Sequence, residues 1–145
     1  MSGSSGHAEN RRQARIQAVQ QLYGREMRGA LAVADGQEQE SGVDEVNPFT
    51  RELVVVTTGR LTEIDGLLAG ALQNWDLRRL GAVDRAVLRV AVAELLACQD
   101  IPAAVTINEA IEIARTLAST ESARFANGVL DRVRKEIGRD PRAKG

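Results

Sequence analysis

The sequence is short of the side chains that carry most enzyme chemistry. It has one cysteine, Cys98, and one histidine, His7, which lies in the glycine- and serine-rich start of the chain. No internal disulfide can form, and Cys98 has no histidine beside it to activate it as a nucleophile. Residues with metal-ligand spacing and glycine-rich phosphate loops are missing too. We therefore expect no metal, no cofactor and no catalysis, and we expect Cys98 to be a small core residue in a reducing compartment, the cytoplasm.

Long apolar runs are also missing. The most apolar stretch, Val83–Cys98, is interrupted by Arg89 and Glu94, so the sequence predicts no membrane span. The first seven residues, MSGSSGH, lack the apolar segment of a signal peptide. We interpret residues 1–7 as the disordered remnant of an expression tag, and residues 8–138 as a single helical domain.

Aromatic residues are few, with two phenylalanines, one tyrosine and one tryptophan. A core that lacks them depends on leucine, isoleucine, valine and alanine, which suits closely packed helices. Apolar residues recur at helical spacing, and no segment alternates over the length of a strand. The sequence therefore predicts an all-α fold of six or seven helices. The expected helices cover about 8–28, 48–72 (as one helix, or as two separated near Thr58–Gly59), 84–98 at the centre of the fold, 105–117, and a last helix that ends near Ile137, with Asn47 as the cap before Pro48.

Charge is balanced overall but unevenly spread. The chain has 19 basic and 20 acidic residues, yet positions 11–28 and 124–145 each carry a net charge of +4. A loop at 35–47 is acidic, and a C-terminal tail at 139–145 is basic. Two basic segments favour an anionic partner if they meet in space.

Three arginines, Arg11, Arg12 and Arg15, crowd the start of the first expected helix. Acids are favoured there, because unpaired amides and the macrodipole make a helix start positive. Arginine binds phosphate oxygens and stacks on bases, so the group indicates RNA binding at a small cost to the helix; a solvated face is the alternative. By the roughly 100° step of a helix, Arg12 falls in line with Val19 and Tyr23, which predicts that the arginines sit at the lip of the domain.

The last helix contains a second candidate for RNA binding. If Ala126, Val129 and Val133 face inward, Phe125 points roughly 100° away from the centre. Phe125 then either packs into a neighbouring groove or, with Arg124 beside it, forms an exposed platform on which an unpaired base stacks.

Four sequence blocks occur in order: RRQARIQAVQQLY; W and R ahead of DRAVLRVAVAEL; P followed by INEAIEIA; and SARFANGVLD. In this order and spacing they resemble the NusB family of bacterial transcription antitermination and ribosomal-RNA synthesis factors. The resemblance covers roughly residues 11–133, apart from the acidic stretch around 35–47. Ala93 stands where many relatives carry an aromatic residue, and Ala126 replaces a commoner valine, which suggests altered packing rather than altered function.

The resemblance implies an all-helical protein of two small bundles packed across one another, without enzymatic activity. It implies pairing with NusE, a small-subunit ribosomal protein, and binding of the pair to the single-stranded boxA element of nascent RNA. Such a complex helps RNA polymerase resist termination, notably on ribosomal-RNA operons. Some members of the family also form homodimers through the surface that otherwise meets RNA.

Carried over by motif, the resemblance assigns residues to two surfaces. The implied RNA-binding residues are Arg11, Arg12, Arg15, Arg124 and Phe125. The residues implied to face NusE are Tyr23, Asp84 and Glu121. Asp84 is also a candidate N-cap for the helix expected at 84–98, and both roles can hold together.

Two other functions compete with this hypothesis. One is the NusB-like RNA-binding module of certain ribosomal-RNA cytosine methyltransferases, which precedes a cofactor-binding α/β domain; these 145 residues contain no such domain. The other is a protein-binding helical scaffold with its arginines on a solvated face. Salt dependence separates RNA binding from the scaffold, because phosphate contacts make binding fall steeply as salt is added.

Overall fold

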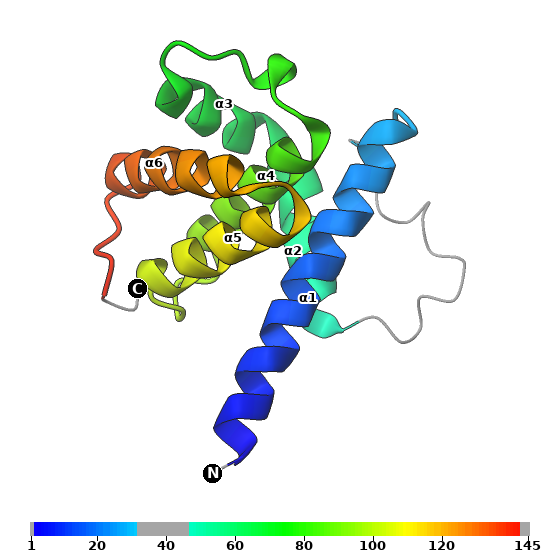
Figure 1. Cartoon of the computed structure of the whole chain (residues 1–145), viewed down its shortest axis with the longest axis vertical. Coiled ribbons are helices and arrows are strands. Elements are labelled where there is room, and N and C mark those ends of the chain that lie inside the picture. Colours follow the sequence, from blue (N-terminus) through cyan, green and yellow to red (C-terminus); the bar gives the residue numbers. More distant parts are fainter. Residues whose placement is uncertain (1, 32–46, 143–145) are drawn as a thin grey trace.

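The computed structural model describes residues 2–31 and 47–142. Within them every regular element is helical, which confirms the all-α prediction (Figure 1). The acidic loop predicted at 35–47 lies outside the described residues except for Asn47. The elements are α1 (Ser2–Met27), α2 (Pro48–Gly59), α3 (Leu61–Leu72), the short 3₁₀ helix η3 (Leu77–Arg79), α4 (Ala82–Ala97), α5 (Ala103–Leu117) and α6 (Thr120–Glu136).

Helix α4 lies at the centre of the fold, as the sequence predicts. Every residue from Ala86 to Leu95 is buried. Helices α1 and α2 pack on each other and on α4, while α5 and α6 pack on each other and on α4, and α6 also packs on α3. The helices thus form two small bundles packed across one another, with α4 shared between them (Figure 1). None of the helices in the described ranges is long and apolar enough to cross a membrane.

Local signals set the boundaries of α2 and α3. Asn47 is the N-cap of α2, because its side-chain oxygen accepts a 2.7 Å hydrogen bond from the N–H of Phe49. Pro48 takes the first helical position, where its missing N–H does no harm. The break falls at Arg60, close to the predicted one, so this segment forms two helices.

The N-terminus of α4 differs from the prediction. The helix begins at Ala82, and its N-cap is Gly81, whose extended backbone leads into the first turn. The interpretation of Asp84 as the N-cap is therefore wrong. Asp84 instead lies within the first turn, where a carboxylate still interacts favourably with the positive end of the helix dipole.

Helix α1 begins at Ser2, earlier than the predicted start near residue 8. Residues 2–7 are thus part of a helix, where the sequence predicts a disordered segment at 1–7. Once a helix has nucleated, each added residue contributes another backbone hydrogen bond, so the amphipathic part of α1 extends the helix toward the N-terminus. The three arginines consequently lie beyond the first turn, where the helix dipole no longer disfavours a positive charge.

The buried face of α1 is also rotated from the predicted one. Ala14 and Leu22 are buried, whereas Tyr23, predicted to lie in line with Val19, is 39% exposed, and Met27 at the end of the helix is 54% exposed. The small side chain of Ala14 lets α2 approach closely, and the hydroxyl of Thr50 on α2 donates a 2.9 Å hydrogen bond to the carbonyl of Ala14. Close contact between the two backbones decides the rotation of α1, and helical spacing alone does not reveal it.

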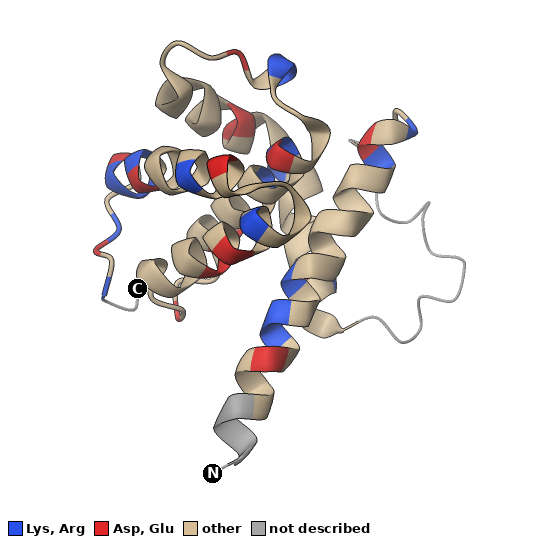
Figure 2. Ribbon diagram, viewed as in Figure 1, with Lys and Arg blue, Asp and Glu red and all other residues tan. Residues whose placement is uncertain are grey.

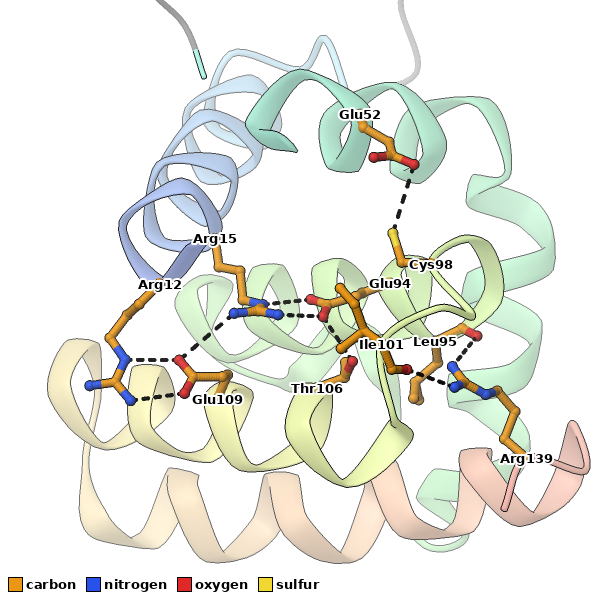
Figure 3. Close-up of polar contacts among 10 residues, drawn as sticks. All are labelled: Arg12, Arg15, Glu52, Glu94, Leu95, Cys98, Ile101, Thr106, Glu109 and Arg139. Atoms are coloured by element: carbon orange, nitrogen blue, oxygen red, sulfur yellow. Dashed lines mark hydrogen bonds and ion pairs between the residues drawn. The ribbon is translucent and has the colours of Figure 1, made fainter. Parts of the chain in front are cut away.

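A buried ion pair joins α1 to the centre of the fold (Figure 3). The side chains of Arg15 on α1 and Glu94 on α4 are almost completely buried, and Nε and Nη2 of Arg15 each donate a 2.7 Å hydrogen bond to the Glu94 carboxylate. Thr106 of α5 donates a further hydrogen bond of 2.8 Å to the same carboxylate. One carboxylate thus connects α1, α4 and α5.

The chain after α6 docks onto the end of α4, although the sequence predicts a basic tail from residue 139 (Figure 3). Arg139 is buried, and its guanidinium donates hydrogen bonds of 3.0 Å to the Leu95 carbonyl and 2.8 Å to the Ile101 carbonyl. Gly138, at φ +77°, lets the chain turn back after α6. The tail prediction is wrong for Arg139, because carbonyls at and beyond the end of a helix need donors that the helix cannot supply.

We expect Glu94→Gln to lower the free energy of unfolding by about 3 kcal/mol, because it leaves the buried Arg15 charge with only the Glu109 carboxylate, 3.9 Å away, as an ionic partner. Urea unfolding followed by circular dichroism measures the change. Arg60→Ala is the control, since Arg60 pairs with Glu63 at an exposed position, and it should leave stability nearly unchanged. Equal effects for the two substitutions would contradict a structural role for the buried pair.

We expect Arg139→Ala to destabilise the fold by about 2–3 kcal/mol, because two carbonyls lose a charged donor. Hydrogen exchange should localise the effect to the last turn of α4 and the connector that follows it. Arg142→Ala removes the same charge from an exposed position and serves as the control. If both variants unfold at the wild-type urea concentration, the docked segment adds nothing to stability.

Candidate nucleic-acid interface

The three arginines that the sequence groups together have different environments. Arg15 is only 4% exposed, and Glu94 accepts two of its hydrogen bonds. The structure therefore places Arg15 in the core and not on the predicted RNA-facing lip. The physical reason is the matching carboxylate, because an arginine can be buried when a partner neutralises it and occupies its donors.

Arg11 is half-buried against the aromatic ring of Phe49 at the start of α2. Its guanidinium carbon lies 5.0 Å from the ring centroid, and that of Arg15 lies 5.3 Å from the same ring. Both distances suit a cation–π interaction. Phe49 thus holds the Arg11 guanidinium at the α1–α2 boundary.

Arg12 points toward α5, where it meets Glu109 (Figure 3). Its Nε and Nη2 donate hydrogen bonds of 2.8 and 2.9 Å to the two carboxylate oxygens, and its side chain stays 42% exposed. These hydrogen bonds raise the pKa of Arg12 and hold the pKa of Glu109 below its ordinary value. A guanidinium carries five N–H groups, so the pair leaves Arg12 with further donors at the surface.

An open groove separates the first half of α1 from the connector between α4 and α5. Its empty space is about 780 Å³, including the part open to solvent. Arg11, Arg15 and Glu109 contribute to its walls, with Asp100 and the exposed Val105 opposite α1. The groove therefore has cationic, anionic and apolar parts.

The second predicted patch lies on α6. Arg124 is exposed, while Phe125 is half-buried and packs against the hydrophobic core. The ring of Phe125 also meets Trp75 edge to face, with ring centroids 5.9 Å apart and an angle of 74° between the planes. Phe125 thus packs against the core and keeps part of its surface accessible, so its burial alone does not decide between the two predicted alternatives.

The two arginine-containing patches are held by contacts with different elements. The α1 patch rests on Phe49 of α2 and Glu109 of α5, whereas the α6 patch contacts Trp75 in the connector between α3 and η3. Helix α5 begins beside the groove at Pro102 and ends at Leu117, just before α6. An RNA strand that touches both patches would follow α5 across the surface.

The residues implied to face a protein partner are accessible. Tyr23 is 39% exposed, Asp84 is half-buried in the first turn of α4, and Glu121 is exposed in the first turn of α6. Glu26, one turn after Tyr23, forms an ion pair of 2.6 Å with Arg85, the neighbour of Asp84. The structure thus brings Tyr23 and Asp84 to the same end of the molecule, while Glu121 lies on a different helix.

Basic and acidic residues are interspersed along the helices (Figure 2). Many basic residues of the two basic segments bind acceptors within the protein: Arg15 binds Glu94, Arg134 binds Asp131, and Arg139 binds backbone carbonyls. The positive charge available to a partner is therefore smaller than the sequence count predicts. Position and geometry of the remaining arginines matter more than their number.

Cys98 is buried, and burial is the main cause that raises the pKa of its thiol to about 12. Its sulfur lies 3.8 Å from a carboxylate oxygen of Glu52, which also disfavours the thiolate (Figure 3). A thiol in this environment is a poor nucleophile. The described part of the chain holds no group of three or more residues able to ligate a metal.

Sequence reasoning did not assign Phe49, Glu109 or Trp75 to a site. Glu109 belongs to the INEAIEIA block, so the sequence does mark its neighbourhood, but its partner Arg12 is 97 residues away. Trp75 stands out as the only tryptophan, yet its contact with Phe125 depends on how α6 packs. Such long-range pairs have no signature in a single sequence.

Known proteins resemble this chain in both sequence and fold. The family model of the NusB family matches residues 12–135. The transcription antitermination protein NusB of Bacillus mycoides is 44% identical over 129 residues, which cover 88% of this chain and 98% of that protein. The structure of T. maritima NusB has a TM-score of 0.73 and 36% identity, and the match covers 87% of this chain and 91% of that one.

A third match comes from the crystal structure of a plectonemic RNA supercoil. Its protein chain has a TM-score of 0.72 and 26% identity, over 88% of this chain and 95% of that one. Sequence identity, coverage and fold therefore agree. The chain belongs to the NusB family of transcription antitermination proteins.

Proposed function

We propose that this protein binds single-stranded boxA-type RNA, pairs with NusE, and acts in the RNA polymerase antitermination complex that supports ribosomal-RNA transcription. The observation that carries the proposal is the pair Arg11 and Arg12: Arg11 lines an open groove, Arg12 is held by Glu109 of the groove wall, and both keep exposed surface. Membership of the NusB family and the likeness to a chain solved in a structure of RNA support it.

The two patches divide the work of RNA recognition. Arg11 and Arg12 offer charged donors to phosphates, which provide affinity and register but read no sequence. Phe125, with Arg124 beside it, offers an aromatic surface on which an unpaired base stacks. Arg15 supports the site from within, because its pair with Glu94 fixes the turn of α1 that carries Arg11 and Arg12.

NusE binds, in this proposal, at the end of the molecule that exposes Tyr23 and Asp84, with Glu121 on α6 contributing to the same partner. An exposed tyrosine beside carboxylates is a suitable anchor for a basic ribosomal protein, since aromatic residues are enriched at interfaces. A homodimer through the RNA-facing surface would compete with RNA. Light scattering with and without RNA distinguishes the two assemblies.

The alternatives have less support. The match covers 98% of the Bacillus mycoides antitermination protein, which favours a factor of this kind over a module of a ribosomal-RNA methyltransferase. A protein-binding scaffold would leave Arg11 and Arg12 without an anionic ligand, although both are partly exposed beside the groove. RNA binding therefore accounts for more of the surface.

We expect Arg11→Ala, Arg12→Ala and Phe125→Ala each to weaken binding of a labelled boxA-like RNA about tenfold, with NusE present. Fluorescence anisotropy at several salt concentrations measures the affinity. Each arginine variant should also reduce the slope of log affinity against log salt concentration by about 1, because one phosphate contact is lost. Phe125→Ala should leave this slope unchanged.

Arg60→Ala, which removes an exposed arginine outside both patches, is the control for the arginine variants and should bind as wild type does. Circular dichroism confirms that each variant is folded. Absence of sequence-dependent RNA binding by the folded wild type, with and without NusE, would favour the protein scaffold.

We expect Glu109→Gln to strengthen RNA binding severalfold at low salt. The substitution removes a carboxylate at the edge of the groove and releases the Arg12 guanidinium for phosphate. Glu63→Gln makes the same charge change in another exposed arginine pair and is the matched control. Weaker binding by Glu109→Gln would show instead that Glu109 is needed to position Arg12.

A further inference from the structure

The only tryptophan of the chain is its most exposed large apolar side chain. Trp75 lies in the connector between α3 and η3 and is 60% exposed, the highest value among the large apolar residues of the described ranges. Leaving so much indole in water forgoes a large hydrophobic gain. The ring nevertheless has a definite neighbour, because it meets Phe125 edge to face at 5.9 Å.

We propose that Trp75 and Phe125 form an aromatic platform of two rings set at 74° to each other, each of which stacks on a separate unpaired base of the bound RNA. This inference rests on the proposed function and adds Trp75 as a base-contacting residue. Two rings from separate elements present a wider surface than Phe125 alone. Base–aromatic stacking of this kind tolerates different bases, because every base has a π face.

The connector that carries Trp75 is held in place by hydrogen bonds. The backbone N–H of Trp75 donates a 3.2 Å hydrogen bond to the Leu72 carbonyl. Arg85 of α4 reaches under η3 and donates to the Leu77 and Leu80 carbonyls at 3.2 and 2.6 Å. A ring mounted on a fixed backbone loses little conformational freedom when a base stacks on it.

Helix α6 is fastened to the same connector. Arg132, two turns after Phe125 and on the same face of α6, donates a 2.9 Å hydrogen bond to the carbonyl of Ala71 in the last turn of α3. Arg132 therefore holds α6 to the end of α3, and the ring contact between Trp75 and Phe125 holds α6 to the connector that follows. The platform is part of the fold and does not have to form on binding.

Charge around the platform suits a phosphate backbone. The Arg78 side chain is 89% exposed, and Arg79 and Arg124 are exposed as well. Two acids share this surface: Asp76, which is bound by Arg78 in its own turn, and Glu121, which is exposed. The arginines therefore outnumber the acids beside the two rings.

The same surroundings favour RNA over a protein as the ligand. A protein-binding hot spot has further apolar residues around its aromatic anchor, which exclude water. Trp75 instead follows the exposed polar residues Gln73 and Asn74 and precedes charged ones. Aromatic rings among arginines and amides are typical of single-strand RNA surfaces.

Because Trp75 is the only tryptophan, the intrinsic fluorescence of the whole protein reports on this one site. Unlabelled protein, titrated with boxA-like RNA alone and then with a tryptophan-free NusE present, should lose indole fluorescence. The loss should saturate at the RNA concentration at which anisotropy of labelled RNA saturates. This readout needs no variant of Trp75.

In the anisotropy assay, Trp75→Ala should weaken RNA binding about tenfold, and Trp75→Phe should recover part of the loss because it keeps a ring. Val55→Ala, which shortens an exposed apolar side chain on α2, should bind as wild type does. Arg78→Ala should weaken binding more than Arg60→Ala, since both arginines form local exposed pairs and only Arg78 adjoins the platform.

The outcomes separate this inference from the proposed function. RNA binding that depends on Arg11 and Arg12, without a change in Trp75 fluorescence and with normal affinity of Trp75→Ala, overturns the platform and leaves the proposed function intact. Normal RNA binding with loss of NusE binding in Trp75→Ala overturns it as well and makes Trp75 a protein contact. If no RNA binds to the folded protein, both proposals fail.

Discussion

The buried ion pair between Arg15 and Glu94 is the contact on which the arrangement of the site depends. It joins α1 to the central helix, and the hydroxyl of Thr106 ties α5 to the same carboxylate. Burying two charges brings little net stability even when they match, but it penalises strongly any packing in which one of them lacks its partner. The pair thereby selects one rotation and one axial position of α1, and that choice decides which way Arg11 and Arg12 point.

The three arginines of α1 near this pair differ in how far they are buried. Arg15 is wholly internal, Arg12 is divided between Glu109 and solvent, and Arg11 lies along the ring of Phe49. All three contribute to one rigid turn of helix, so a ligand that meets Arg11 and Arg12 meets groups that are already ordered. A nearly neutral protein can offer a localised phosphate site in this way, without a general excess of positive charge.

The sequence predicts the helical class, the central position of α4 and the start of α2 at Asn47, because helical spacing and capping are local properties. It also identifies the family. It places Arg15 and Arg139 at the surface, whereas both are buried. Their burial depends on acceptors on other elements, and Glu94, for example, is 79 residues from Arg15. Charge in a sequence shows that partners are needed, but it does not show whether they are internal or external.

The same distinction explains why Trp75 and Phe125 differ from the arginines as guides to function. A carboxylate of the same protein can satisfy an arginine, so an arginine in a motif can serve either the fold or a ligand. The indole of Trp75 stays 60% exposed, although Arg85 anchors η3 just after it and its ring meets Phe125 edge to face. In the proposed platform, a ligand whose flat faces match an aromatic ring accounts for this exposure.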